Sequence, residues 1–193
     1  MAGPQTERAS ELAHHFAQAL PTVEQEVAAH YAELAGRRAV ELFSFAEAAE
    51  HFAFAADHTP RDRPDHHIDR LLAAGGAWRD GGCFDEAFAA LDEAIGQALD
   101  LGDHRRAVQG AVAYADTSWR PGLPTFPTVE HLERALQITP DTEVAMRAQA
   151  LAALGQARHF TGGGGDREAD AATALATALG DPRLLGEVLW SQA

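Results

Sequence analysis

The sequence has 193 residues, with 15 Lys+Arg against 29 Asp+Glu, which gives a formal net charge of −14. This length predicts one ordinary domain, and the excess of acid argues against a protein that wraps a nucleic-acid backbone. The single cysteine, Cys83, excludes an internal disulfide. No apolar run approaches the roughly 18–20 residues that span a bilayer, and the N-terminal residues lack a secretory pattern. We therefore expect a cytoplasmic protein with no membrane partner.

Alanine dominates the apolar residues. The sequence contains 42 alanines but only 11 isoleucines and valines together. Strands favour β-branched residues, whereas alanine is the best helix former and lets helix axes approach closely. The composition predicts an all-α fold.

Apolar residues recur at steps of three and four along most of the chain, and prolines and glycines interrupt this pattern at short intervals. The interruptions divide the chain into about ten helices. The predicted spans, in chain order, are 6–20, 22–43, 45–57, 65–80, 84–100, 103–119, 128–138, 141–160, 166–179 and 182–192.

The helices repeat with a period of about 39–41 residues, which is in the range of known helical-hairpin repeats. Gly36 and Gly75 are one period apart, and Gly155 lies two periods beyond Gly75. The linker Leu-Gly-Asp at 101–103 returns at 179–181, again two periods later. A period of this length with two helices per unit predicts a helical-hairpin solenoid. We expect each glycine to lie where its helix approaches the alanines of the next helix.

The second unit reads Leu71-x2-Ala74-Gly75-x2-Trp78, followed by Ala87-x3-Leu91. This pattern resembles the tetratricopeptide repeat. The resemblance implies a right-handed α-solenoid of about four hairpins after an N-terminal lead-in helix at 1–21. The repeat domain would span 22–193, with units at 22–60, 65–101, 103–140 and 141–179 and an incomplete fifth at 180–193.

The opening part of the chain refines the resemblance. Segments 11–16 (ELAHHF), 29–31 (AHY), 35–39 (AGRRA) and 47–52 (EAAEHF) resemble the helical arm of large ATP-dependent LuxR-type transcriptional regulators of the STAND class. In that family the arm follows a nucleotide-binding switch domain and precedes a helix-turn-helix. This sequence has no lysine and so no phosphate loop. The resemblance therefore implies a non-enzymatic protein-interaction or sensor module, with no direct nucleic-acid binding.

Helical solenoids present a concave face to their partners. If the first helix of each unit lines it, the residues expected to face a partner are His30, Glu33, Arg37, Asp69, Arg79, Thr117, Arg120, Gln149, Gln156 and His159. Guanidinium groups bind carboxylates with two hydrogen bonds. Arg37, Arg79 and Arg120 therefore suggest a protein or peptide partner with an acidic segment; the alternative is that they neutralise acids beside them.

The last predicted helix carries an apolar face that includes Leu185, Val188, Leu189 and Trp190. Solenoids normally close with a polar cap. We expect this end to be a fragment boundary or an association surface for self-association.

A second hypothesis is a stand-alone metal-binding protein or enzyme that uses the His-rich loop around His66. Residues 57–69 contain histidines and aspartates that are suitable as metal ligands, but their spacing fits no common template. No serine lies in a nucleophile elbow, and no base is fixed beside Cys83. We therefore expect no enzymatic activity, no bound metal and no cofactor.

Overall fold

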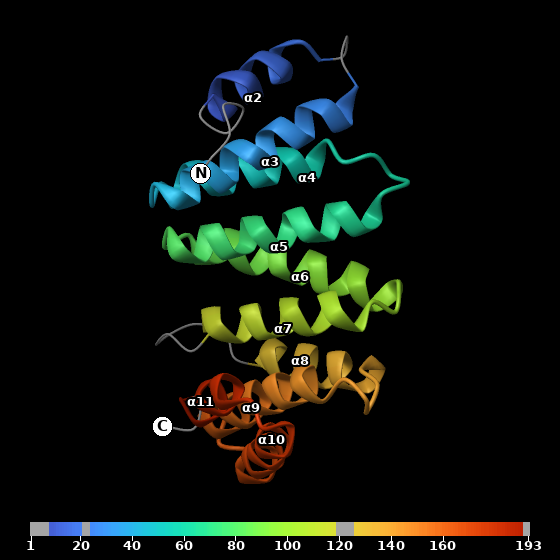
Figure 1. Ribbon diagram of the computed structural model, residues 1–193, viewed down its shortest axis with the longest axis vertical. Coiled ribbons are helices and arrows are strands. Elements are labelled where there is room, and N and C mark those ends of the chain that lie inside the picture. Colours follow the sequence, from blue (N-terminus) through green and yellow to red (C-terminus); the bar gives the residue numbers. More distant parts are fainter. Residues whose placement is uncertain (1–7, 21–23, 119–125, 191–193) are drawn as a thin grey trace. The chain divides into compact units, whose positions relative to one another are not determined.

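The described part of the protein is all-α. The computed structural model describes residues 8–20, 24–118 and 126–190, and these contain helices but no strand (Figure 1). The helices are α2 (Ala9–Gln18), α3 (Gln25–Glu41), α4 (Phe45–Asp57), α5 (Pro64–Asp80), α6 (Phe84–Asp100), α7 (His104–Ser118), α8 (Phe126–Ile138), α9 (Val144–Phe160), α10 (Asp166–Leu179) and α11 (Pro182–Trp190). The predicted all-α class is confirmed, and α4, α6 and α10 have the predicted bounds at both ends.

Two of the differences from the predicted helix bounds involve proline. Helix α8 begins at Phe126, two residues early, and includes Pro127 in its first turn. A first-turn proline is tolerated because its missing N–H has no intrahelical partner. Helix α9 begins three residues late, because the Glu143 N–H donates to the Pro140 carbonyl in a preceding turn (3.0 Å).

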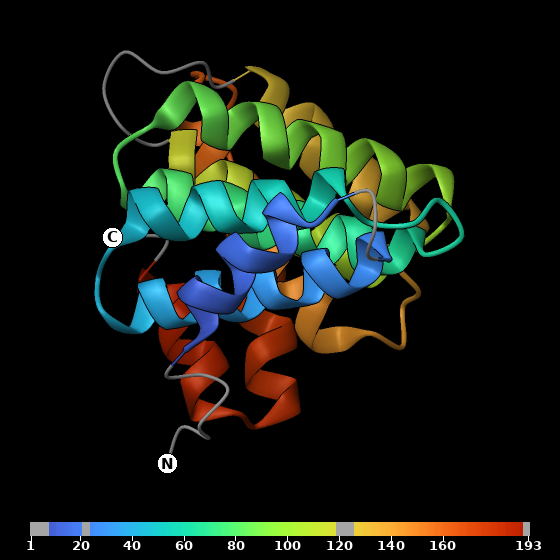
Figure 2. The same cartoon turned by 90° about the horizontal axis from the view of Figure 1, so that it is seen from above.

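The chain divides into two compact units, unit 1 up to Ala94 and unit 2 from Ile95, with the boundary inside α6. In unit 1, each helix from α2 to α5 packs against the next (Figure 2). In unit 2, α7 to α11 follow the same rule, and α9 also contacts both α7 and α11. Of the described helices, none combines the length and apolar character needed to cross a bilayer.

Glycines mark the closest helix contacts in unit 1. A β-carbon at Gly36 would lie 2.8 Å from the Phe52 ring, and one at Gly75 would lie 2.6 Å from Leu91 Cγ. Close approach was expected at both glycines, and at Gly75 the Ala87 carbonyl oxygen of the next helix does lie 3.4 Å from the β-carbon position, but the nearest atoms at both glycines belong to a larger side chain. Each accommodates a large side chain of the following helix, and the neighbouring alanines complete the core around it.

In unit 2, the equivalent glycine faces a backbone. A β-carbon at Gly155 would lie 3.0 Å from the Gly165 carbonyl oxygen and 3.2 Å from the Ala169 nitrogen. Gly165 has φ +144° and lies at the start of α10. The glycine-rich turn therefore lets the start of α10 approach α9 more closely than a side chain would allow.

The corner between α3 and α4 differs from the corner one period later. Phe43 has φ +59°, whereas Gly82, at the corresponding position of the next unit, has φ +81°. This left-handed backbone conformation is readily adopted by glycine, whereas it costs free energy for a residue with a β-carbon such as phenylalanine. The Phe43 side chain is also 79% exposed, so burial does not offset that cost.

Candidate functional site

A groove of about 1100 Å³ lies between α7, α9 and α11 in unit 2. Its apolar lining includes Val108 and Val112 of α7, Ala152 and Ala153 of α9, and Trp190 of α11. Polar side chains also line it, namely Arg105, Gln109, Asp116, Gln149, Gln156 and Glu187. We name this hollow the α7–α9–α11 groove.

The repeat explains why these three helices share one face. Gln109, Gln149 and Glu187 follow one another at intervals close to one period and take similar positions on α7, α9 and α11. The direct contacts of α9 with α7 and α11 bring these positions together. Gln149 Nε2 donates to Glu187 Oε2 (3.4 Å), and Glu187 also accepts from Arg183 Nε (3.0 Å). Glu187 is thus held within a local polar network.

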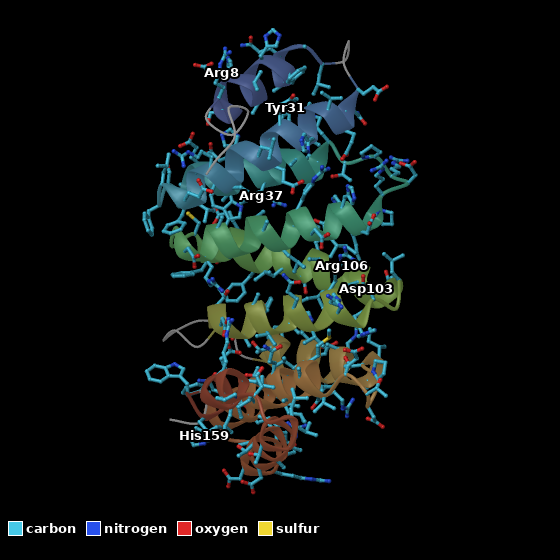
Figure 3. The ribbon with its side chains drawn as sticks, in the orientation of Figure 1. Arg8, Tyr31, Arg37, Asp103, Arg106 and His159 are labelled. Carbon is cyan, nitrogen blue, oxygen red and sulfur yellow. The ribbon has the colours of Figure 1, made fainter. Side chains whose placement is uncertain are left out.

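The two ends of α7 bring opposite charges to the groove. Arg105 lies in the first turn and Asp116 in the last turn, and both side chains are exposed. Arg106, beside Arg105, turns back to Asp103, with 2.6 Å between Nη1 and Oδ2 (Figure 3). Burial would raise the pKa of Asp103, but the hydrogen bonds and charge of Arg106 outweigh it and hold that pKa below its usual value. The Arg106 guanidinium therefore binds Asp103, whereas Arg105 lines the groove.

The structure brings four of the predicted partner-facing and association residues to the groove. Gln149 and Gln156 line it from α9, and Val188 and Trp190 line it from α11. The sequence alone did not indicate Arg105, Gln109 or Asp116.

Several other predicted residues of unit 2 lie elsewhere. Thr117 is fully buried and donates from Oγ1 to the Ala113 carbonyl (2.9 Å), so the prediction that it faces a groove does not hold. His159 is exposed beside Phe160 and does not line the groove. Arg120 lies outside the described residues.

Of the four residues of the predicted association surface on α11, some are buried by helix packing and others are exposed. Val188 is only 1% exposed and packs with α9 and α10, so it does not form part of an open apolar face. Leu185 is half-buried against the same cluster. Leu189 and Trp190 remain exposed, the latter by 83%.

In unit 1, both predicted arginines have acidic neighbours. Arg37 Nη2 donates to Glu33 Oε1 (2.5 Å), and Arg79 Nε donates to Asp80 Oδ1 (2.9 Å). His30 and Asp69 are exposed. For the described arginines, the geometry therefore favours the alternative that they neutralise nearby acids.

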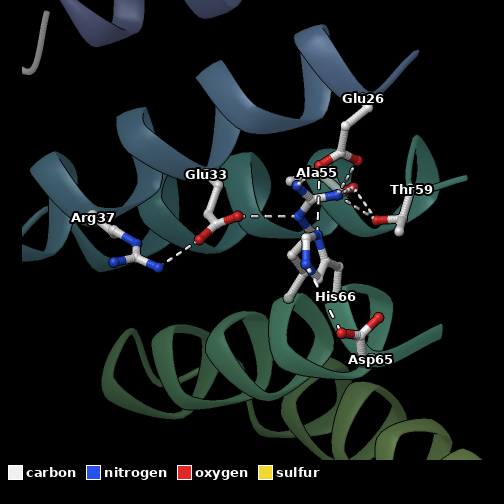
Figure 4. Close-up of polar contacts among 8 residues, drawn as sticks. Glu26, Glu33, Arg37, Ala55, Thr59, Asp65 and His66 are labelled. Carbon is white, nitrogen blue, oxygen red and sulfur yellow. Dashed lines mark hydrogen bonds and ion pairs between the residues drawn. The ribbon is translucent and has the colours of Figure 1, made fainter. Parts of the chain in front are cut away.

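A polar cluster of unit 1 centres on Arg70, which the sequence pattern did not indicate as a site residue. Its side chain is 2% exposed and contacts Glu26 and Glu33 of α3 and Thr59 just after α4, three residues labelled in Figure 4. Arg70 donates to both carboxylate oxygens of Glu26 (3.0 and 3.1 Å), to Glu33 Oε2 (3.2 Å) and to Thr59 Oγ1 (2.7 Å). We name these four residues the Arg70 cluster.

The pKa of Glu26 reflects this cluster. Burial would raise it, but hydrogen bonds and charge from Arg70, with a smaller effect of His66, hold the pKa below its usual value. Burial would likewise lower the pKa of Arg70, and Glu26 and Glu33 reverse that effect and raise it. Arg70 thus stabilises the ionised form of Glu26, and the hydrogen bonds of the cluster join α3, α5 and the residue just after α4.

A signal for the Arg70 cluster was present in the sequence. Arg70 lies four and seven residues before the buried Ala74 and Ala77, on the apolar stripe of its helix. A charged residue at such a position needs a partner. Glu26 and Glu33 are seven residues apart, about two turns of α3, and so lie on one face of that helix.

His66, at the centre of the predicted His-rich loop, lies in the first turn of α5 and borders the Arg70 cluster. His66 Nδ1 lies 3.5 Å from Glu26 Oε1, and Nε2 lies 3.9 Å from Asp65 Oδ2. Within residues 8–20, 24–118 and 126–190, no three His, Cys, Asp or Glu side chains are grouped so that they could hold a metal ion.

Comparison with models of known protein families and with curated protein sequences finds no match for this chain.

Proposed function

We propose that this protein is a non-enzymatic protein-interaction module and that the α7–α9–α11 groove receives a peptide segment of its partner. The observation that carries the proposal is the groove itself, which combines an apolar lining with three glutamine side chains. Its volume of about 1100 Å³ is close to the upper end of the range of about 300–1000 Å³ typical of small-molecule pockets, so it has room for a short peptide segment.

The lining favours a peptide in particular. Ala152 and Ala153 keep part of it shallow, so that a partner backbone can approach closely. Gln109, Gln149 and Gln156 each offer amide donors and acceptors. Such side chains fix the register of a peptide, while the apolar surface supplies the free energy of binding.

For the fold, we propose a tetratricopeptide-like, right-handed solenoid of about four hairpins. The glycine contacts support it, because Gly36 with Phe52 and Gly75 with Leu91 repeat one arrangement in successive hairpins. The left-handed corners at Phe43 and Gly82 are likewise one period apart. Both features follow the repeat that first indicated this family.

For the biological role, we propose that the module is related to the helical arm of LuxR-type regulators and has a sensor or regulatory task. Support for this comes from the four sequence segments within residues 11–52 and from the repeated Leu-Gly-Asp linkers. The groove would then be where another protein, or another domain of a regulator, is recognised.

The proposal is tested by selecting random 12-residue peptides on phage against the whole protein and measuring the enriched peptides by titration calorimetry. In Gln149→Trp, an indole would obstruct the groove, and we expect at least a tenfold loss of affinity. Gln137→Trp is the matched control, since Gln137 is exposed on α8 outside the groove. Circular dichroism should be the same for both variants. Failure to enrich any peptide, or equal binding by both variants, would overturn the proposal.

A further inference from the structure

The corner between α3 and α4 closes with a hydrogen-bond pattern that also ends α5, α6 and α9. The Ser44 N–H donates to the Ala39 carbonyl and the Phe43 N–H to the Val40 carbonyl, each over 2.9 Å. This pair of bonds forms a Schellman motif, in which the residue after the helix cap takes a left-handed conformation and is usually glycine. At the ends of α5, α6 and α9, that residue is Gly82, Gly102 and Gly162.

Phe43 thus stands where glycine would form the same motif at a lower cost. Of the described residues, it is the only one other than glycine with a positive φ. Its ring is 79% exposed, so it does not fill the core. Backbone strain that persists without a gain in packing is typical of functional positions. We therefore looked for a role of this ring outside the folded chain.

Two neighbouring side chains extend the apolar surface at Phe43. Leu42 is 61% exposed and Val40 is 39% exposed. We name Val40, Leu42 and Phe43 the apolar corner. Exposed apolar patches mark interaction sites, and aromatic residues are enriched in protein interfaces. Because the Phe43 ring is largely free of contacts with its own chain, a partner must supply the pocket that buries it.

The charges beside the apolar corner indicate what kind of surface it fits. Residues 38–50 contain three glutamates, Glu41, Glu47 and Glu50, all exposed, and one arginine, Arg38. Arg38 is already paired with Glu41 (2.6 Å). Acidic surroundings are repelled by the anionic surface of a membrane. They are also repelled by a second copy of this chain, which has a net charge of −14. A basic protein surface is attracted instead.

We propose that the apolar corner inserts into an apolar pocket of another protein and that basic side chains surround this pocket opposite Glu41, Glu47 and Glu50. It is a second interaction surface, in unit 1, and shares no residue with the α7–α9–α11 groove. Phe43 is its anchor, since a buried aromatic side chain at the centre of an interface carries much of the binding energy. The glutamates accelerate association with the basic surface.

The test begins with photo-crosslinking of the whole protein. The photoreactive residue p-benzoylphenylalanine replaces Phe43, and the protein is irradiated in an extract of the cells that encode it. The matched control carries the same residue in place of Phe160, which is 57% exposed in unit 2. Mass spectrometry should identify a protein that is crosslinked from position 43 and not from position 160. A product with lipid, a product with a second copy of this chain, or no specific product would overturn the proposal.

The identified protein is then purified, and its binding is measured by biolayer interferometry. Phe43→Gly and Phe43→Ala should each weaken binding at least tenfold, because both remove the ring and only the first relieves the backbone strain. Phe160→Ala should bind as the wild type does. Unchanged affinity of both Phe43 variants would overturn the proposal.

The charge requirement is tested on the same purified pair. Glu50→Lys should slow association and reduce its dependence on salt, since it places a cation opposite the basic surface. Glu130→Lys is the matched control, because Glu130 is an exposed glutamate on α8 of unit 2. It should associate at the wild-type rate. An association rate that Glu50→Lys leaves unchanged would overturn the basic character of the pocket.

Discussion

Gly75 of α5 lies directly against Leu91 of α6, and a β-carbon on the glycine would come within 2.6 Å of the leucine Cγ. Leu91 is fully buried, so it has no free space into which to move. We expect Gly75→Ala to lower the free energy of unfolding by about 1–2 kcal/mol, because overpacking outweighs the better helix propensity of alanine. Chemical denaturation followed by circular dichroism measures this change.

The adjacent Gly76 provides the control. Apart from its chain neighbours and the nearby backbone of its own helix, no atom lies within 4 Å of a β-carbon built there. Gly76→Ala should therefore raise the free energy of unfolding by about 0.5–1 kcal/mol. Equal effects of the two substitutions would contradict the close contact at Gly75.

Removing the charge of Arg70 should lower the free energy of unfolding far more than removing the charge of Arg37, although both arginines bind Glu33. Arg70→Met leaves the Glu26 and Glu33 carboxylates without their buried partner. We expect a loss of about 2–3 kcal/mol, below the roughly 3–5 kcal/mol of fully buried pairs because both carboxylates are partly exposed. Arg37→Ala removes an exposed pair and should change stability by no more than about 0.5 kcal/mol. Urea titrations of both variants compare the two losses directly.

Stability should decrease in acid partly through Glu26. Its pKa is lowered in the folded protein from an ordinary value of 4.5, so the stabilisation is complete above pH 4.5 and is lost as the pH falls through the lower folded value. Glu26→Gln lacks this contribution. The difference in free energy of unfolding between wild type and Glu26→Gln should be largest near pH 7 and shrink below pH 4.5. A difference that stays constant from pH 7 to pH 3 would disprove the linkage.

Replacing Phe43 with glycine should stabilise the protein. Its φ of +59° costs roughly 1–2 kcal/mol for a residue with a β-carbon. Glycine loses part of that gain through the greater freedom of the unfolded chain, so we expect a net increase of about 0.5–1 kcal/mol. Phe43→Ala retains the backbone strain and should give no increase. The Phe43 ring also meets the Phe45 ring edge-on, with 6.1 Å between their centroids. Thermal unfolding of the two variants distinguishes relief of strain from loss of this ring contact.

Most helix positions could be predicted because their determinants are local. Helix α6 runs from Phe84 to Asp100 as expected, between the Gly81-Gly82 turn and Gly102. The start of α8 was misplaced because Pro127 was taken as a boundary rather than a first-turn residue. The repeat likewise located the tight glycines correctly, but periodicity alone could not tell which side chains they face.

The groove was harder to predict because rotation about a helix axis decides which side chains face it. Thr117 was expected there, whereas its neighbour Asp116 lines the groove and Thr117 is buried. One residue along a helix turns the side chain by about 100°. An error of a single position in the register of α7 therefore exchanges a partner-facing residue for a core residue. In α9, Gln149 and Gln156, which were expected to face a partner, both line the groove.

The Arg70 cluster also affects the dynamics of unit 1. Arg70 belongs to α5 but binds Glu26 and Glu33 of α3 and the hydroxyl of Thr59 just after α4. Local detachment of any one of these helices would leave buried charge without its partner, which is unfavourable. The amides of α3, α4 and α5 should consequently exchange with solvent through a shared opening, as one cooperative folding unit rather than as three independent helices.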